Sequence, residues 1–422
     1  MLKKLYIHNF KSFWESTFEF GKLNCLIAPN NTGKSNLIEA LEFCDKLLFS
    51  REDEEPKFSF SELKNYKYNE DNIRFELEFE LANRVLVYYD LFDYKYSVKF
   101  NIIFGTINNI DVAVNGYLKH ITIFNKDNKN ILSQTLGIRL YGDELKKDIV
   151  NYEKYDEELT SKRYTKFDFT YSQNTLNYGL TCQSTLQESI FTLFGFQMNT
   201  KNELVKPIKL KNIFSKKIFS SYDFQPYLIK QQSISSFQLN KIGTNLTEFI
   251  AGQLDETIED ISTSLIGEIE QVTGIVIDRE TAFKTLSFIE NNSHKVPLNK
   301  ISDGTVHFLA IMSALIANGR EIETIMIEEP ERHLHMKVLS YILNSMRDCE
   351  AQIFFTTHSG ELLKILKQDE IIFLYRDELN GDTKGLSASK IKKLDKLFKK
   401  YKYEITEIIK DGVLGYLGDY DG

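Results

Sequence analysis

The segment KLNCLIAPNNTGKSNLIEAL, residues 22–41, decides how the rest of the chain is interpreted. It opens with a nearly all-apolar run, which is typical of a strand buried on both faces. It closes with apolar residues, among them Leu37, Ile38 and Leu41, that share one face of a helix beginning near Gly33. A turn between a buried strand and a helix that ends in Gly33-Lys34-Ser35 is the setting of a phosphate-binding loop, or P-loop.

In a P-loop, successive backbone N–H groups and the helix N-terminus form a concave anion site. We expect the Lys34 ammonium to reach the β- and γ-phosphates of a nucleotide, and the Ser35 hydroxyl to ligate Mg²⁺. Ala28 replaces the first glycine of the usual pattern, and a Cβ at a position of positive φ costs about 1–2 kcal/mol. We therefore expect an ordinary β conformation at Ala28. The predicted nucleotide-binding residues are Asn30, Asn31, Thr32, Gly33, Lys34, Ser35 and Asn36.

A second apolar segment, TIMI at residues 324–327, is followed directly by two carboxylates, Glu328 and Glu329. A buried parallel strand that ends in two acids is typical of a Walker B motif. We expect Glu328 to hold Mg²⁺ through its water shell and Glu329 to orient or deprotonate the attacking water during ATP hydrolysis. The alternative to a Walker B motif is a strand that ends in two solvent-exposed carboxylates without a catalytic role.

Two shorter motifs lie on either side of this strand. Ser302-Asp303-Gly304 precedes an apolar helix, and in isolation it is an ordinary helix cap. Thr357 and His358 follow the apolar strand QIFF, and a single histidine in such a place more often has a structural role. The position of His358 after a strand that itself follows the Walker B segment favours a functional role.

The motifs occur in the order P-loop, SDG (302–304), EEP (328–330) and His358. This order resembles that of the motifs in the nucleotide-binding heads of ABC and SMC proteins. More narrowly, the chain resembles the RecF-like and OLD-like (overcoming lysogenization defect) ATPases. The residues that carry this likeness are LYIHNFKSF at 5–13, GTNL at 243–246 and EPERHLH at 329–335. The likeness covers about residues 1–50 and 240–375.

The resemblance implies an α/β fold, an ABC/SMC-type P-loop ATPase head with an antiparallel β subdomain and a helical insertion. It also implies a site shared by two chains of a homodimer or higher homo-oligomer, with ATP and Mg²⁺ as cofactors. In one subunit Lys34, Glu329 and His358 would be catalytic, and Ser35 and Glu328 would hold the metal. Ser302, Asp303 and Gly304 of the other subunit would close over the γ-phosphate, with Arg332 and His333 in the adjacent D-loop position contacting the partner.

We predict four segments along the chain. Residues 1–180 form a first ATPase lobe, in which IRFELEFEL, RVLVYYDLF, YKYSVKFNIIF and GYLKHITIF alternate as successive antiparallel strands. Residues 181–275 form a helical insertion that offers an assembly or partner surface. Residues 276–390 form a second ATPase lobe, which contains the SDG signature, the Walker B segment and His358. Residues 391–422 form a lysine-rich tail. Within the insertion, one amphipathic stretch places on one face Leu246, Ile250, Leu254, Ile258, Ile261, Leu265 and Ile269.

Composition narrows the class of protein. The chain has no apolar run of eighteen residues and no export signal, so we expect a cytoplasmic protein without a membrane partner. Its four cysteines include no CxxC pair, which favours buried free thiols over a zinc site. A net charge of −8 argues against a wholly basic surface but allows a local basic patch.

The resemblance also suggests a biological role. Stand-alone ATPases of this kind look like the sensor halves of two-gene bacterial anti-phage systems (PARIS, AbiL or Septu-like). An OLD-type TOPRIM nuclease domain would not fit after His358, so we expect a separate effector, a TOPRIM- or HNH-type nuclease. The trigger would be a nucleic acid or a phage protein.

Two alternatives remain open. A RecF-like DNA repair or maintenance ATPase would need a basic surface, which lysines 206, 209, 211, 216 and 217 and the tail lysines 390–402 could supply, although solvated helix faces explain them equally. A nucleotide-gated scaffold would bind ATP with little turnover. The two Walker B glutamates weigh against that scaffold, although slow turnover is compatible with sensing.

Overall fold

The computed structural model describes residues 1–29, 31–49, 60–68, 72–80, 217–231, 238–279, 284–377, 379–391 and 394–409, and the backbone of strands between residues 84 and 205. The chain forms two compact units. The first comprises Met1–Lys3, Phe18–Glu55 and Phe214–Gly422, and the second comprises Lys4–Thr17 and Pro56–Ile213. This division differs from the predicted lobes, because the residues after Phe214 belong to the same unit as the P-loop. Asn30 and lysines 206, 209, 211 and 216 lie outside the described residues.

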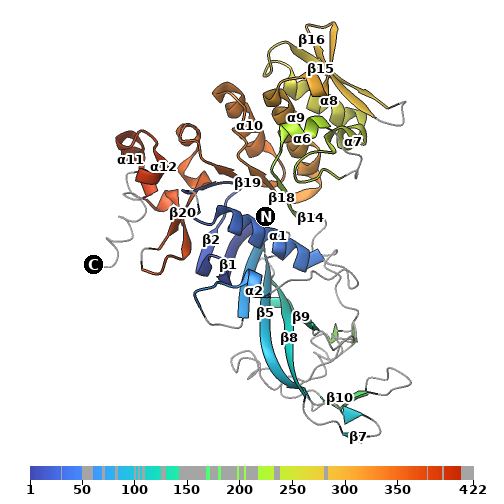
Figure 1. Cartoon of the computed structure of the whole chain (residues 1–422), viewed down its shortest axis with the longest axis vertical. Helices are drawn as coiled ribbons and strands as arrows, with labels where there is room; N and C mark the ends of the chain where they lie inside the picture. Colours follow the sequence, from blue (N-terminus) through green and yellow to red (C-terminus); the bar gives the residue numbers. More distant parts are fainter. Residues whose placement is uncertain are drawn as a thin grey trace. The chain divides into compact units, whose positions relative to one another are not determined.

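The first unit is built on a six-stranded sheet with the order β14-β18-β19-β3-β20-β21 (Figure 1). Its strands are β14 (Lys217–Tyr222), β18 (Ile322–Glu328), β19 (Gln352–Thr357), β3 (Leu23–Ile27), β20 (Ile371–Arg376) and β21 (Thr383–Ser387). All neighbours are parallel except β20 and β21. The carboxyl ends of parallel strands share one edge of a sheet, so the segments that follow β3, β18 and β19 meet there. This mixed sheet with its helices confirms the predicted α/β fold class.

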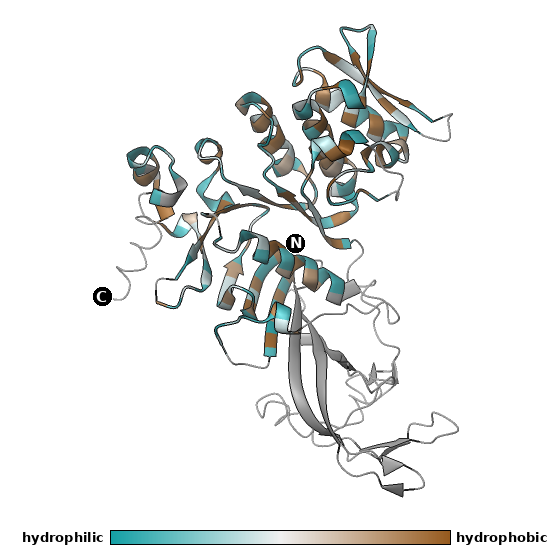
Figure 2. Ribbon diagram, viewed as in Figure 1, coloured by the Kyte–Doolittle hydropathy of each residue, from teal (hydrophilic) through white to brown (hydrophobic). Residues whose placement is uncertain are grey.

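Helices surround a continuous apolar core in this unit. The helix α9 (Asp303–Ile316) is buried without interruption from Thr305 to Leu315, because α6 (Pro226–Gln231), α8 (Asp255–Leu265) and α10 (Met336–Asp348) all contact it. A helix buried on all sides is apolar on all sides. The amphipathic α10, by contrast, shows apolar and polar colours on its two sides in Figure 2.

The segment predicted as a helical insertion, 181–275, differs from that expectation. Lys217–Tyr222 is the strand β14, paired in parallel with β18, so the prediction of a mainly helical segment is wrong there. The amphipathic stretch is divided between α7 (Leu246–Ala251) and α8. Leu254 lies between these helices and is 77% exposed, whereas Ile250 and Ile261 are buried. The interruption after α7 turns Leu254 away from the apolar face that regular helical spacing predicts.

A small antiparallel sheet completes the described part of this unit. It contains β15 (Val272–Asp278), β16 (Thr285–Glu290) and β17 (His294–Pro297). The lysine-rich tail forms the short helices α11 (Leu394–Lys400) and α12 (Ile405–Ile408). The helix α1 (Lys34–Phe49) begins next to Gly33, where the sequence indicates.

The second unit contains the predicted antiparallel strands. Its largest sheet has the order β2-β1-β4-β5-β8-β9. The strands are β1 (Leu2–Phe10), β2 (Phe13–Glu19), β4 (Asn72–Glu80), β5 (Arg84–Val98), β8 (Ile110–Phe124) and β9 (Asn130–Tyr141). RVLVYYDLF and the start of YKYSVKFNIIF form the single strand β5 rather than two strands. Shorter elements are α2 (Phe60–Leu63), β6 (Asn101–Ile102), β7 (Gly105–Thr106), β10 (Asp168–Tyr171), β11 (Gly179–Thr181), β12 (Gln197–Met198) and β13 (Leu204–Val205).

Among the helices that the structure describes, none combines the length and the hydropathy needed to cross a lipid bilayer.

Candidate active site

The loop between β3 and α1 has the backbone of a phosphate-binding loop. Asn31 and Gly33 adopt positive φ values of 62° and 110°, whereas Ala28 does not adopt a positive φ, as expected. Arg376 donates to the Asn31 carbonyl at 2.8 Å, and Thr383 donates to the Thr32 carbonyl at 2.6 Å. The C=O and N–H of one peptide plane point in opposite directions, so anchoring these carbonyls also fixes the direction of the N–H groups that follow.

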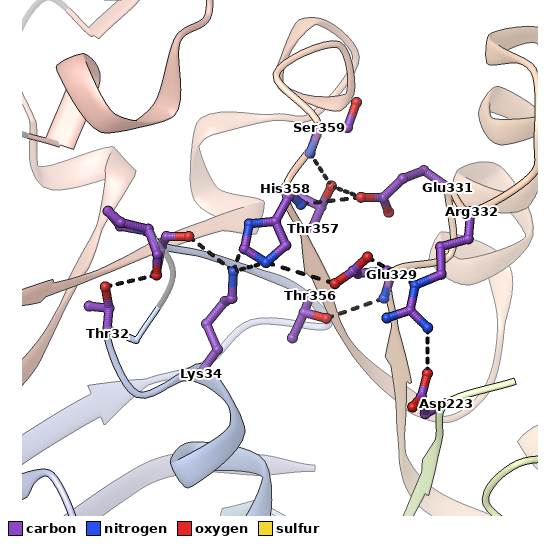
Figure 3. A network of polar contacts seen from close by, with 12 residues as sticks. Thr32, Lys34, Asp223, Glu329, Glu331, Arg332, Thr356, Thr357, His358 and Ser359 are labelled. Atoms are coloured by element: carbon purple, nitrogen blue, oxygen red, sulfur yellow. Dashed lines mark hydrogen bonds and ion pairs between the residues drawn. The ribbon is translucent and has the colours of Figure 1, made fainter. Parts of the chain in front are cut away.

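Lys34 lies between the P-loop backbone and His358. Its ammonium donates to the Ala28 carbonyl at 3.0 Å and lies 2.6 Å from Nε2 of His358 (Figure 3). Burial lowers the pKa of Lys34, while the carboxylates of Glu329 and Glu331 act in the opposite direction. Burial and the Lys34 charge lower the pKa of His358. A neutral imidazole can accept a hydrogen bond from an ammonium, so the two groups are compatible at neutral pH.

Glu328 has the surroundings of a cation ligand. It ends β18 opposite Thr356 of β19, and burial followed by the charge of Asp223 raises its pKa. Lys241 lies 3.9 Å from its Oε1, beyond hydrogen-bond distance, and forms a closer ion pair of 2.8 Å with Glu42. A half-buried carboxylate with a raised pKa is stabilised by a further cation. A carboxylate and a hydroxyl, such as that of the exposed Ser35, are the oxygen ligands that Mg²⁺ prefers, so these residues fit the ion.

Glu329 is fixed by both its backbone and its side chain. Its φ is 44°, and its N–H donates to the Thr356 carbonyl at 3.1 Å and to the Thr356 hydroxyl at 3.2 Å. Arg332 donates to Oε2 at 2.9 Å, while Oε1 lies 3.8 Å from Nε2 of His358. Burial acts to raise the pKa of Glu329, but the hydrogen bond and charge of Arg332 outweigh it and hold this pKa below its ordinary value. Glu329 is therefore ionised at neutral pH and can accept a hydrogen bond from water.

Glu331 connects the segments that follow β18 and β19. Its Oε1 accepts from the Thr357 hydroxyl at 2.6 Å and from the His358 N–H at 3.2 Å. The carboxylate therefore fixes the backbone from which the His358 ring projects. Glu331 lies within the EPERHLH run, but its sequence pattern predicted no role for it. Its spacing of two residues from Glu329, directly after Pro330, is the signal that could have indicated one.

The SDG motif caps α9. The Ser302 hydroxyl accepts from the Thr305 N–H at 3.1 Å, which confirms the helix-cap interpretation. Asp303 pairs with Lys230 of α6 at 2.6 Å. A Cβ on Gly304 would lie 2.6 Å from the His333 carbonyl, so this glycine permits a close approach of two backbones. The contacts of the motif thus run to α6 and His333, whereas Lys34 and Glu329 both contact His358.

The G-x-N-L element has a structural role at the start of α7. Gly243 has a φ of 83°, and a Cβ there would lie 2.9 Å from side-chain atoms of Phe224 and Ile229. The buried Asn245 side chain donates to the Gln238 carbonyl at 2.7 Å and accepts from the Asn240 N–H at 3.0 Å. The resulting compact turn carries Lys241, which faces Glu42 and Glu328. No feature of the sequence pointed to Lys241 or to Asp223.

The P-loop follows β3, two acids stand at the end of β18, and a histidine directly follows β19, the strand between β3 and β18. This arrangement defines an ATPase of the AAA/SMC-like type. The chain belongs to the family described as "AAA domain, putative AbiEii toxin, Type IV TA system", which matches residues 23–109 and 210–364. This match confirms the prediction, made from the sequence motifs, that the chain is an ABC/SMC-type ATPase.

A relative from Helicobacter pylori (strain ATCC 700392 / 26695), an "ATP/GTP phosphatase", is 24% identical over 382 residues, which are 87% of this chain and 88% of the relative. Two solved structures are similar. The SMC head domain from Thermotoga maritima is 12% identical with a TM-score of 0.41, over 92% of this chain and 98% of that chain. An SMC head "bound to the C-winged helix domain of ScpA" is 12% identical with a TM-score of 0.49, over 92% of this chain and 99% of that chain.

Proposed function

We propose that the protein binds ATP with Mg²⁺ and hydrolyses it slowly in a site completed by a second copy of the chain. The observation that carries the proposal is that Lys34 and Glu329 both contact His358, and these three residues come from three separate segments at one edge of the sheet. The activity in the name of the Helicobacter pylori relative supports nucleotide hydrolysis.

Each residue has a distinct part in this reaction. Lys34 contacts the β- and γ-phosphates, and Ser35 with Glu328 holds the metal. Bound Mg²⁺ supplies positive charge to the phosphate oxygens. Glu329 accepts a hydrogen bond from water, whose oxygen bonds to the γ-phosphorus as the bond from this phosphorus to the bridging oxygen breaks. ADP leaves with that oxygen, and the proton of the water passes to Glu329 or to the phosphate product.

The second copy supplies Ser302, Asp303 and Gly304. Ser302 and Asp303 are exposed at the start of α9, where the helix N-terminus carries partial positive charge suited to a phosphate. Asp303 pairs with Lys230 of α6, and Ser302 caps α9. Both exposed residues therefore remain accessible to a nucleotide that is held by another chain. ATP would thereby join two subunits, and hydrolysis would release them.

This proposal is tested with the wild type, Lys34→Ala and Glu329→Gln, by ATPase rate and by particle mass with and without ATP. We expect the wild type to hydrolyse ATP, Lys34→Ala to lose binding, and Glu329→Gln to bind ATP and accumulate as an ATP-dependent assembly. Normal hydrolysis by Glu329→Gln would exclude this residue as the base. A particle mass that is the same with and without ATP would exclude the shared site and favour the scaffold alternative.

We further propose that this ATPase is the sensor component of a bacterial anti-phage system and controls a separate TOPRIM- or HNH-type nuclease. The resemblance to OLD-like ATPases and the family description, which names a toxin and a toxin–antitoxin system, support this role. The test is the plating efficiency of phages on cells carrying the gene with and without its neighbouring gene. Protection should require both genes and be lost in Glu329→Gln. Protection by neither combination would contradict the sensor role, and DNA binding by the purified protein without such protection would favour the RecF-like alternative.

A further inference from the structure

Arg332 bridges two carboxylates that follow two neighbouring strands. Its Nε donates to Oε2 of Glu329 at 2.9 Å, and its Nη1 donates to Oδ1 of Asp223 at 2.7 Å (Figure 3). Asp223 directly follows β14, and Glu329 directly follows β18, the parallel neighbour of β14. The guanidinium is a planar, permanently charged group with donors in fixed directions, which suits it to hold two acids at once.

The bridge gives the two oxygens of Glu329 different surroundings. Oε2 is occupied by Arg332, whereas Oε1 points toward His358, whose Nε2 is 3.8 Å away and in contact with Lys34. Oε1 is therefore the oxygen on the side of the P-loop. A carboxylate without the arginine would be free to rotate about its side-chain bonds and to exchange these two oxygens.

Backbone and side chain of Glu329 are held by separate devices. Two hydrogen bonds from its N–H to Thr356 fix the backbone at a φ of 44°. These bonds do not set the side-chain torsions, which the Arg332 contact does. Arg332 is itself long and half-exposed, and an unpaired arginine loses much rotamer entropy on being fixed. The second contact, to Asp223, keeps the guanidinium in place.

We propose that Arg332, held by Asp223, is a positioning residue that directs Oε1 of Glu329 toward the attacking water within its own subunit. The inference rests on the proposed role of Glu329 in hydrolysis and adds two residues to it. It assigns Arg332 an intrachain role, in place of the partner contact that its D-loop position suggests. It also makes Asp223, which directly follows β14, part of the catalytic apparatus.

The test compares Arg332→Gln, Arg332→Lys and Asp223→Asn with the wild type in steady-state ATPase assays. For Arg332→Gln we expect kcat to fall by roughly 10- to 100-fold, the range that a misplaced catalytic group produces, with unchanged affinity for a non-hydrolysable ATP analogue. Asp223→Asn should lower kcat less, and Arg332→Lys should be intermediate, because an ammonium cannot bridge both acids in the same geometry. Melting temperatures report whether each variant is folded.

A combined variant separates positioning from other roles. In the Glu329→Gln background, Arg332→Gln should cause no further loss of rate and no loss of ATP-dependent assembly, because it acts through the residue already removed. Arg320→Gln, which breaks an exposed ion pair to Asp260 at 3.5 Å, is the matched control and should behave as wild type.

Three outcomes would overturn the inference. Arg332→Gln with a wild-type or higher kcat would show that the arginine does not position the base. Loss of assembly in the combined variant would assign Arg332 to the subunit contact instead. A wild type without ATPase activity would overturn the proposed function together with the inference, whereas an active wild type beside an equally active Arg332→Gln would overturn the inference alone.

Discussion

The ammonium of Lys34 lies 2.6 Å from Nε2 of His358. The contact joins the segments that follow β3 and β19, which are adjacent parallel strands with Thr357 opposite Ile27. An ammonium can only donate, so the histidine ring accepts and is neutral. Burial and the Lys34 charge together lower the pKa of His358, in agreement with this arrangement. The two residues expected to meet the γ-phosphate are thus already aligned with each other.

His358→Ala should lower kcat by about 10²–10³-fold, the usual effect of removing one group that stabilises the charge of a transition state. Nucleotide affinity should change much less, because Lys34 and the P-loop backbone remain. Steady-state kinetics and binding of a non-hydrolysable analogue measure the two effects. His294→Ala, on the exposed strand β17, is the control. An unchanged kcat in His358→Ala would assign this histidine a structural role.

Glu328→Gln and Ser35→Ala should each raise the Mg²⁺ concentration needed for half-maximal activity, by about 10- to 100-fold. Burial and the charge of Asp223 raise the pKa of Glu328, so a cation beside this carboxylate stabilises its ionised form. A Mg²⁺ titration of ATPase rate and calorimetry with the Mg²⁺ complex of an ATP analogue check this. Glu361→Gln, which alters an exposed pair with Lys364, should leave the titration unchanged. An identical titration curve for Glu328→Gln would exclude it as the metal residue.

Gly304→Ala should destabilise the fold by about 1–3 kcal/mol, because the new methyl group would lie 2.6 Å from the His333 carbonyl and force two backbones apart. ATP-dependent assembly should fall as well, since the start of α9 would shift. Urea unfolding and particle mass measure these effects. Gly274→Ala is a suitable comparison, because its nearest contact, the Ser262 hydroxyl, lies at an ordinary 3.5 Å. Equal stability of the two variants would contradict the close approach.

Asp45 gives the fold a pH dependence. Burial, opposed by the nearby Lys217, raises the pKa of Asp45 from 3.8 to about 6. The folded state therefore binds more protons than the unfolded state between these values, and this contribution to stability is full below pH 3.8 and is lost as pH rises toward about 6. Asp45→Asn keeps an oxygen that accepts from the Phe219 N–H and removes the charge.

The variant should therefore be more stable than the wild type above pH 6, by up to about 3 kcal/mol, from the shift at 1.36 kcal/mol per pKa unit. At pH 4 the two should converge. Denaturant unfolding at both pH values checks the difference. A gap of equal size at pH 4 and pH 8 would show that the substitution acts through packing rather than through proton binding.

Much of the site could be predicted because its motifs are local. The turn from β3 into α1, the acids at the end of β18 and the Ser302 cap each depend on residues close together in the chain. Strand period and capping chemistry act over a few residues, so sequence pattern reveals them. The resemblance that the order of these motifs carries also implied that Lys34, Glu329 and His358 act in one subunit.

The failures came from interactions between distant residues. The strand β14 is short and covered on both faces, so it has no alternation that would distinguish it from a helix. Leu254 fits the helical spacing of its neighbours, but the break after α7 turns it to solvent. Lys241 lies near Glu328 because the compact turn before α7 carries it there, and Asp223 lies near Arg332 because β14 pairs with β18. Neither contact corresponds to a local sequence pattern.

The sequence by itself therefore determined the class of fold, the P-loop and the identity of the acids and histidine that surround it. Only the tertiary structure decided which oxygen of Glu329 faces the P-loop, because Arg332 reaches both Glu329 and Asp223 across neighbouring strands. Local propensity fixes where a strand ends, whereas the orientation of a side chain at that end depends on partners brought by long-range sheet pairing.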